Sequence, residues 1–354
     1  MAAIHLRSQT PETLAEAIPG LPLAVARRVL HRVVGEDRDD LDGVRGLSKA
    51  LAAEIGGRGR LDRLEVLDRR RSALDPFVKY LFRSADGRVF EAVRIPLEKP
   101  RWSVCLSTQV GCALGCRFCE TGRVGFLRNL EPWEMVEQAL TVRRESPERP
   151  LTGAVFQGQG EPFQNYDNVL RAARILRDPS GARIGSDRIT LSTVGLLPQI
   201  ERYTEEGHPY RLILSLTSAF SEKRESLVPV TARYGVPELA AAMRRHAAAR
   251  GGPVNLAWVL ISGFNSGPEE AREVARLFRG VAVRLSVIDV NDPAGGFARA
   301  TDEERGRFLS ALSANGLGFV RRYSGGPDID AACGMLASRT RGGQAHAPRP
   351  PVPP

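Results

Sequence analysis

Apolar and amphipathic segments alternate along the chain from about residue 103 onward. The apolar segments have the length of buried strands and occupy residues 104–108, 154–157, 188–193, 211–216, 254–261 and 283–288. The segments between them repeat apolar residues at helical spacing, as in residues 132–144, 168–177, 237–250 and 268–278. Strands that alternate with helices are typical of a parallel sheet, here one closed or partly closed into a barrel. The pattern therefore predicts an α/β fold with six strand–helix units, and residues 318–323 are a candidate for one further strand.

The first hundred residues follow a different pattern. Valines recur at helical spacing at Val25, Val29 and Val33, which predicts a small helical unit. Residues 56–71 alternate glycine, arginine and acidic residues, a composition that fits a linker or an exposed helix. Two apolar runs then flank Asp86-Gly87, a dipeptide that favours a tight turn between antiparallel strands. We therefore predict a helical accessory domain (residues 1–60), a linker and β-hairpin (61–100), a barrel (101–340) and a disordered Gly/Pro-rich tail (341–354).

The charge of the chain bears on its partners. The net charge is +9 at pH 7. An excess of lysine and arginine favours a polyanionic partner, because these residues displace counterions from phosphates. An arginine-rich surface without such a partner explains the charge equally well. No apolar run reaches membrane-spanning length, and the first twenty residues lack the apolar core of a signal peptide. We therefore expect a cytoplasmic protein with no membrane partner.

Three of the five cysteines crowd into one short segment, with Cys112, Cys116 and Cys119 in the order Cys-x3-Cys-x2-Cys after the first predicted barrel strand. Such crowding does not fit a disulfide framework and indicates a metal or redox site. Three thiolates at this spacing can bind one iron–sulfur cubane and leave one iron open to a further ligand. The alternative is a zinc site completed by Cys105 or Cys333. It is less favoured, because zinc ligands usually come as paired Cys-x2–4-Cys spacings.

Polar residues follow several of the predicted strands, at the edge where parallel barrels carry their active sites. Gly160 and Glu161 follow the second strand, and Glu161 favours an ammonium ligand because it would repel a phosphate. Ser192 follows the third strand, the segment Ser215 to Thr217 the fourth, and Asn291 the sixth. Each alone is typical of a helix N-cap. Together they predict a ring of hydrogen-bonding groups around one ligand.

From the hairpin to about residue 340, the order of motifs resembles the RlmN/Cfr family of radical S-adenosylmethionine (AdoMet) RNA adenine methyltransferases. The matches include Glu91 four residues before Ile95-Pro96, Cys105 to Cys112, Gly160 to Pro162, Thr190 to Thr193, Ser215-Leu216, Asn291 and Asp328 to Gly334. The last motif, Asp-Ile-Asp-Ala-Ala-Cys-Gly, is highly specific when joined to the cysteine spacing. The resemblance implies a partial (βα)6 radical SAM barrel with a [4Fe–4S] cluster and AdoMet as cofactors.

The resemblance also implies a role for each matched residue. Cys112, Cys116 and Cys119 would bind the cluster. Cys333 would carry the methyl group as S-methylcysteine, Cys105 would form a transient disulfide with Cys333 to free the methylated base, and Glu91 would accept a proton. The residues implied in AdoMet binding are Gly160, Glu161, Ser192, Ser215, Leu216, Thr217 and Asn291.

The implied activity is methylation of adenine carbon C2 or C8 in ribosomal or transfer RNA, with an electron donor such as flavodoxin or ferredoxin as a further partner. These ring carbons are electron-poor and do not attack AdoMet as nucleophiles, so a radical route is needed, and thiol–disulfide exchange can release the product. Candidate phosphate contacts are Arg58, Arg60, Arg69, Arg70, Arg71, Arg321 and Arg322, and Tyr323 is available to stack on a base.

Some positions depart from the family pattern, namely Gln159, Val194, Thr217, Asp292 and Met335. None removes a thiol or Glu161, so the reaction type is retained. Two alternatives stay open: a diverged radical AdoMet enzyme that methylates a peptide or small metabolite, and a non-catalytic iron–sulfur or zinc RNA-binding protein. The presence of both Cys105 and Cys333 favours the adenine mechanism over the first alternative. Tolerance of Cys333→Ala would favour the second.

Overall fold

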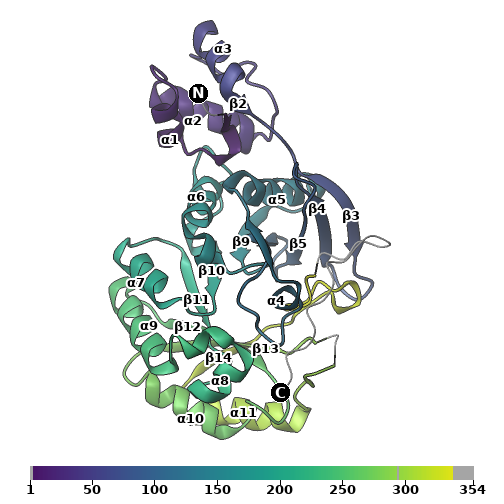
Figure 1. The fold of residues 1–354 in the computed structure, drawn as a ribbon, viewed down its shortest axis with the longest axis vertical. Helices are drawn as coiled ribbons and strands as arrows, with labels where there is room; N and C mark the ends of the chain where they lie inside the picture. The colour runs from purple at the N-terminus through teal and green to yellow at the C-terminus, as the bar shows by residue number, and fades with distance from the viewer. Residues whose placement is uncertain (1–2, 293–294, 338–354) are drawn as a thin grey trace.

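Ten strands form one sheet in the computed structural model, which describes residues 3–292 and 295–337 (Figure 1). The predicted tail at residues 341–354 lies outside the described residues. The strand order is β14-β13-β12-β11-β10-β9-β6-β5-β4-β3. The parallel part comprises β6 (Trp102–Leu106), β9 (Leu151–Phe156), β10 (Ile189–Thr193), β11 (Arg211–Ser215), β12 (Val254–Leu260), β13 (Val283–Asp289) and β14 (Gly318–Arg321). All six predicted strands and the seventh candidate are therefore confirmed.

Helices follow the first six parallel strands and complete six strand–helix units. The main helices are α5 (Pro132–Glu145), α6 (Tyr166–Arg177), α7 (Leu197–Glu205), α8 (Ser221–Leu227), α9 (Val236–Arg250), α10 (Pro268–Leu277) and α11 (Asp302–Ala314). Short helical turns are η3 (Pro162–Asn165), η4 (Ser186–Arg188), η5 (Pro229–Ala232) and η6 (Pro327–Ile329). The predicted α/β class with a partial (βα)6 barrel is confirmed. Within the described part of the chain, no helix is both long and apolar enough to cross a bilayer.

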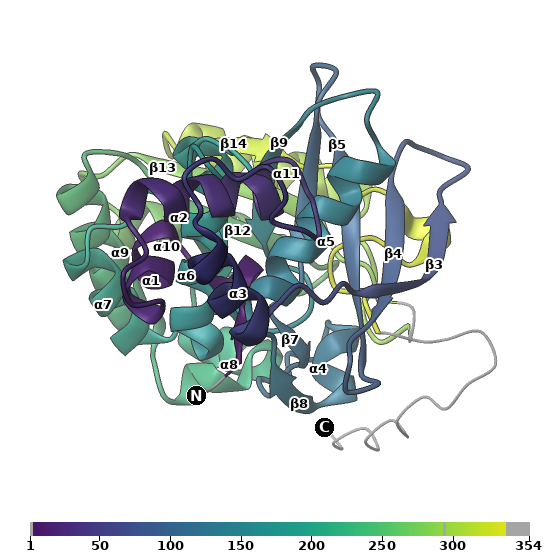
Figure 2. The same ribbon diagram turned by 90° about the horizontal axis from the view of Figure 1, so that it is seen from above.

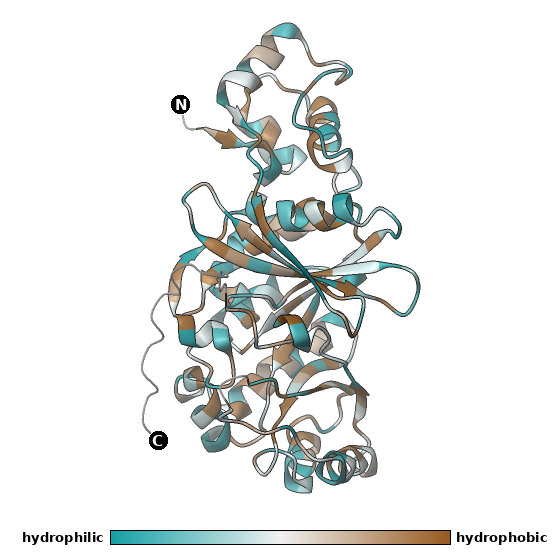
Figure 3. Ribbon diagram, turned by 90° about the vertical axis from the view of Figure 1, so that its right-hand side faces the viewer, coloured by the Kyte–Doolittle hydropathy of each residue, from teal (hydrophilic) through white to brown (hydrophobic). Residues whose placement is uncertain are grey.

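The core lies between the sheet and its helices. In β13, Val283, Leu285 and Val287 are buried while Arg284 is exposed, as the two-residue period of a strand requires. The ring centroids of Trp258 and Phe308 lie 5.4 Å apart in the core, and both side chains are fully buried. Figure 3 shows hydrophobic and hydrophilic positions interleaved along the strands and helices. Burial of one face of each element holds the carboxyl ends of the parallel strands in place.

The predicted hairpin joins this same sheet. Strands β4 (Val78–Arg83) and β5 (Val89–Pro96) are antiparallel, and β5 pairs with β6, so the hairpin extends the barrel sheet. The prediction of a linker or exposed helix over residues 56–71 is wrong for its second half, which forms strand β3 (Glu65–Arg71) on the free edge of β4. Charged residues are common on edge strands, because an edge strand has one unpaired, solvated side. The high arginine content of this segment is therefore the reason that the sequence did not predict a strand there.

The N-terminal helices gather at one end of the molecule, as the purple ribbon in Figure 1 shows. They are α1 (Pro11–Ala17), α2 (Leu23–Leu30), the π-helical turn η2 (His31–Gly35) and α3 (Lys49–Arg58), with η1 (Leu6–Ser8) and the small pair β1 (Ile4–His5) and β2 (Gly59–Arg60). Arg7 is fully buried and donates to Val33 O at 3.1 Å and to Asp39 at 2.6 Å. It also lies 3.7 Å from Glu137 on α5. This buried cation connects the N-terminal helices to the barrel.

Two buried histidines predict how stability depends on pH. Burial lowers the pKa of His5 and of His246 from 6.5 to about 4. The unfolded chain therefore binds protons between pH 6.5 and 4 that the folded chain does not, so stability falls as pH falls through this window. We expect each histidine to remove about 2 kcal/mol of unfolding free energy between pH 7 and pH 5. Urea unfolding at both pH values measures this, and His246→Gln should abolish its share; an equal pH dependence in that variant would contradict the assignment.

Candidate active site

The cysteine loop begins where the first parallel strand ends. After β6 the chain forms β7 (Gln109–Gly111), which pairs with β8 (Phe126–Asn129) and closes the loop that carries the three cysteines and α4 (Glu120–Val124). Gly111 has φ +75°, and a Cβ there would lie 1.7 Å from Gly125 O. Only glycine fits this close approach. The neighbouring Cys112 N–H donates to the same carbonyl at 3.0 Å, which sets the position of the first thiol.

The three thiols lie close together in an apolar setting. Cys116 is buried, and Cys112 and Cys119 are partly buried. Burial is the main cause that raises the pKa of each thiol, that of Cys112 to about 12, and neighbouring thiols raise the pKa of Cys112 and of Cys116 further. Three adjacent buried thiolates repel one another unless cations lie between them. The site therefore fits metal-bound sulfur, since metal binding removes the protons and supplies the positive charge.

The arrangement of donors also bears on which metal group fits. Three thiols from one short loop can each bind a different iron of a cubane. The residues therefore fit a [4Fe–4S] cluster on Cys112, Cys116 and Cys119.

Glu161 lies beside the cysteine loop at the end of β9. Its carboxylate is buried and accepts the N–H of Phe163 and of Val194, each at 3.0 Å. Burial raises its pKa, and the two N–H groups oppose the rise. Gly160 has φ +96°, and a Cβ there would meet Gln109 at 2.5 Å. The turn thus requires glycine, and it places a carboxylate near the cluster thiols, where it can pair with the ammonium of AdoMet.

The polar groups predicted at the next two strand ends also meet. Ser192 Oγ lies 3.3 Å from Ser215 Oγ, and Leu216 is fully buried beside them. Thr217 has φ +62°, uncommon for a β-branched residue. Its hydroxyl is buried and has no hydrogen-bond partner within the described chain. An orphaned buried hydroxyl indicates a missing polar partner, and this one fits a bound ligand such as AdoMet.

Asn291, after β13, connects the predicted AdoMet site to the Cys333 loop. Its Oδ1 accepts from Arg299, and its Nδ2 donates to Ser324 Oγ at 3.2 Å. The same Ser324 oxygen accepts the N–H of Cys333 at 2.8 Å. One serine therefore links a predicted AdoMet residue to the predicted methyl carrier. Arg299 and Ser324 were missed from the sequence, because their roles depend on contacts between loops.

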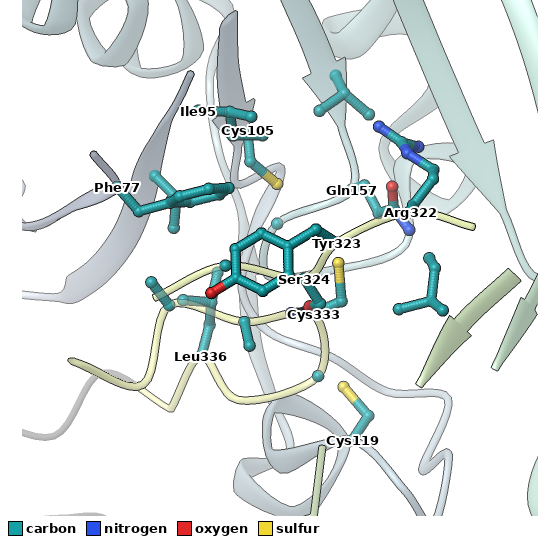
Figure 4. A pocket seen from close by; sticks show the side chains of 18 of the residues that line it. Phe77, Ile95, Cys105, Cys119, Gln157, Arg322, Tyr323, Ser324, Cys333 and Leu336 are labelled. Atoms are coloured by element: carbon teal, nitrogen blue, oxygen red, sulfur yellow. Dashed lines mark hydrogen bonds between the residues drawn. The ribbon is translucent and has the colours of Figure 1, made fainter. Parts of the chain in front are cut away.

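Cys105 and Cys333 line one cavity of about 110 Å³, and Cys119 of the cluster loop lines it as well. In Figure 4, Cys333 lies between Cys105 and Cys119. Burial raises the pKa of Cys105 to about 12, with Cys333 adding to the rise and Arg322 opposing it. Phe77 and Tyr323 form an aromatic part of the wall, with ring centroids 6.2 Å apart. The cavity thus brings both predicted catalytic thiols to the cluster loop.

Glu91 lies apart from this cavity. Its buried carboxylate forms an ion pair with Lys79 at 3.0 Å and accepts the N–H of Ala337 at 2.9 Å. It lines a separate cavity of about 50 Å³ that Met335 also lines. Its proposed proton-accepting role stays a prediction.

Two of the departing residues have clear structural roles. Gln159 is buried, and its Oε1 accepts the N–H of Glu91 at 2.9 Å. Asp292 forms an ion pair with Arg123 of α4 at 2.9 Å and accepts the N–H of Phe297 at 3.0 Å. Both departures therefore stabilise the surroundings of the predicted catalytic residues.

Arg224 on α8 is a further buried residue at the site that the sequence did not reveal. Its guanidinium donates to Leu216 O at 2.9 Å, Ser215 O at 3.1 Å and Thr231 Oγ1 at 2.6 Å, and also to Val194 O. Burial lowers its pKa to about 10, and the charge on Glu161 opposes that fall. Arg224 thus ties the ends of β10 and β11 together beneath the predicted AdoMet residues.

Replacement of Arg224 is expected to destabilise the protein. Arg224→Met removes four hydrogen bonds from a fully buried guanidinium, which costs about 3 kcal/mol of unfolding free energy. Chemical denaturation measures the loss. Arg202→Met, which removes an exposed arginine with pairs to Asp167 and Glu206, should cost less than about 1 kcal/mol. Equal losses in the two variants would contradict the role given to Arg224.

Comparison with known proteins agrees with this geometry. A model of the radical SAM superfamily matches residues 106–278. A probable RNA methyltransferase of Myxococcus xanthus is 43% identical over 353 residues, which cover 98% of each chain. A dual-specificity RNA methyltransferase RlmN of Syntrophotalea carbinolica is 38% identical over 345 residues, or 95% of this chain and 90% of the relative. The crystal structure of a radical SAM methyltransferase from Sphaerobacter thermophilus matches with a TM-score of 0.87 at 39% identity, covering 95% of this chain and 100% of that one.

Fold and site together define a radical SAM enzyme, whose cofactors are a [4Fe–4S] cluster and AdoMet. The chain belongs to the family of radical SAM RNA methyltransferases that includes RlmN.

Proposed function

We propose that this chain methylates carbon C2 or C8 of an adenine in ribosomal or transfer RNA, with Cys333 as methyl carrier. The observation that carries the proposal is the shared cavity of Cys105, Cys333 and Cys119. One thiol can receive a methyl group beside the cluster, and a second thiol lies in the same cavity to release it. A peptide or metabolite methylase that transfers the methyl group directly has no need of this pair.

Each step of the proposed reaction is assigned to particular residues of the chain. When bound, the cluster and AdoMet supply the methyl group and the radical, and the cluster takes back one electron. Gly160, Glu161, Ser192, Ser215, Leu216, Thr217 and Asn291 bind and orient AdoMet. Cys333 sulfur loses its proton and gains the methyl group. This methyl group would lose one hydrogen atom to the radical that AdoMet supplies, and its carbon would then bond to the ring. Glu91 accepts the ring proton. Cys105 attacks Cys333 sulfur, an S–S bond forms as the S–C bond breaks, and a proton completes the product methyl.

The candidate arginines support an RNA substrate unequally. Arg58, Arg60, Arg69 and Arg70 are each ion-paired with a carboxylate of the chain, which weakens the case for phosphate contacts there. Arg321 pairs with Asp289 at 3.2 Å. Arg322 and Tyr323 line the thiol cavity itself, and Tyr323 is 67% exposed. These two residues are the ones we assign to the RNA, Arg322 to a phosphate and Tyr323 to base stacking.

The remaining partners follow from the chemistry. The cluster needs a low-potential reductant such as flavodoxin or ferredoxin, and the disulfide must be reduced by cellular thiols after each turnover. RNA and reducing conditions are both found in the cytoplasm, where we place the protein. The helices of residues 1–60 are proposed as an accessory RNA-binding domain, with residues 61–100 as the linker and the β-hairpin that extends the sheet of the barrel domain at 101–340.

The direct test uses anaerobically reconstituted enzyme with AdoMet, a reductant and unmodified ribosomal or transfer RNA. Nucleoside mass spectrometry should reveal 2-methyladenosine or 8-methyladenosine, and intact-protein mass should show one methyl group on Cys333. Production of 5′-deoxyadenosine without methylated adenosine in any RNA would contradict the proposal and favour a different substrate.

A further inference from the structure

The loop that carries Cys333 is held at both ends by one ion pair. Lys79 Nζ donates to Asp330 O at 3.2 Å, before the cysteine, and Glu91 Oε2 accepts the N–H of Ala337 at 2.9 Å, after it. Lys79 and Glu91 are themselves 3.0 Å apart. The loop therefore depends on two side chains that bind each other.

Strand register explains how these side chains meet. On the antiparallel pair β4–β5, Leu81 lies opposite Glu91 and Lys79 opposite Val93. Lys79 and Glu91 are thus diagonal neighbours on one face of the sheet, within reach of long side chains. Both side chains are no more than 5% exposed. The buried cation and the buried anion stabilise each other, because a buried charge without an opposite charge bears the full desolvation free energy.

The same face carries the thiol cavity. Val93 and Ile95 follow Glu91 at two-residue spacing and line that cavity with Cys105 and Cys333. Glu91 is held from the backbone side too, since its N–H donates to Gln159 Oε1 at 2.9 Å and its carbonyl accepts from Ser107 Oγ. Glu91 is therefore held firmly in place on the strand whose next two inward residues, Val93 and Ile95, line the thiol cavity.

We propose that Lys79 is a positioning residue for the release half of the reaction: it holds Glu91 as the carboxylate that takes the ring proton, and it holds the Cys333 loop at Asp330. This inference rests on the proposed function. In this step the proton passes from the ring carbon to a carboxylate oxygen of Glu91, the C–H electron pair stays with the ring, and Lys79 remains protonated.

Other charged groups surround Glu91 and bear on its titration. Arg70 of β3, Glu120 of α4 and Asp330 of the Cys333 loop line the same small cavity as Lys79 and Glu91. Arg70 forms an ion pair with Asp68, and Glu120 forms one with Arg123. Lys79 is a cation in direct contact with the carboxylate, and its removal takes that positive charge away.

The test follows the two halves of the reaction separately in Lys79→Met, Lys79→Arg, Glu91→Gln and the double variant. Methyl transfer to Cys333 is read as a mass gain without RNA, and release is read as decay of the covalent protein–RNA adduct across pH. We expect Lys79→Met to slow adduct decay by about 10²-fold and to move the acid limb of its pH profile to higher pH. Lys79→Arg should restore both. In the Glu91→Gln background, Lys79→Met should add nothing.

Arg83→Met is the matched control, since Arg83 lies on the same strand with an exposed pair to Glu65. It should behave as wild type. Normal adduct decay in Lys79→Met would overturn the inference. So would an additive effect in the double variant, or an unchanged pH profile in a slowed variant, since each indicates a purely structural role. If wild-type protein gains no methyl group and forms no adduct, the proposed function itself fails.

Discussion

Cys333→Ala is expected to abolish RNA methylation, with a loss of at least about 10⁴-fold, because it removes the thiol proposed as the methyl carrier. The Cys333 side chain is exposed in its loop, so the variant should fold with a stability within about 0.5 kcal/mol of wild type. Nucleoside mass spectrometry measures the first effect and chemical denaturation the second.

Cys105→Ala is the matched control for this prediction. It leaves the methyl carrier in place but removes the thiol that releases the product, so it should gain a methyl group and then retain RNA as a covalent adduct. The adduct appears as a slow band on denaturing gels. Methylated RNA released by Cys333→Ala would show that the methyl group reaches adenine without this cysteine.

Loss of one cluster ligand should eliminate all chemistry. Cys116 is the most buried of the three cysteines predicted to bind the cluster, and Cys116→Ser replaces a soft thiolate with a hydroxyl that binds iron poorly. We expect less than about one tenth of the wild-type iron and sulfide per chain, because the cluster would lose one of its three cysteine ligands. Production of 5′-deoxyadenosine should become undetectable.

Cys105→Ser serves as the control here, since it removes a cysteine that lies outside the cluster loop. It should keep wild-type iron, sulfide and AdoMet cleavage while failing to release product. Full iron content in Cys116→Ser, measured after anaerobic purification, would remove the basis for the assigned ligand set.

Much of the architecture could be predicted from local patterns. Apolar runs of strand length and amphipathic helices are determined by near neighbours in sequence, and the six strand–helix units follow from them. Strand β3 could not be predicted this way, because its arginines are stable in a strand only on the free edge of β4. Helices α7 and α11 were also missing from the prediction.

Sequence alone determined the chemistry of the site: the spacing of Cys112, Cys116 and Cys119, and the isolated thiols Cys105 and Cys333, are properties of the residues in order. Only the tertiary structure decided which groups meet. The shared thiol cavity, the orphaned Thr217 hydroxyl, the buried Arg224 and the Lys79–Glu91 pair all join residues from separate strands and loops. Such contacts depend on sheet register and loop packing, which are set by burial of the whole core and leave no local pattern in the chain.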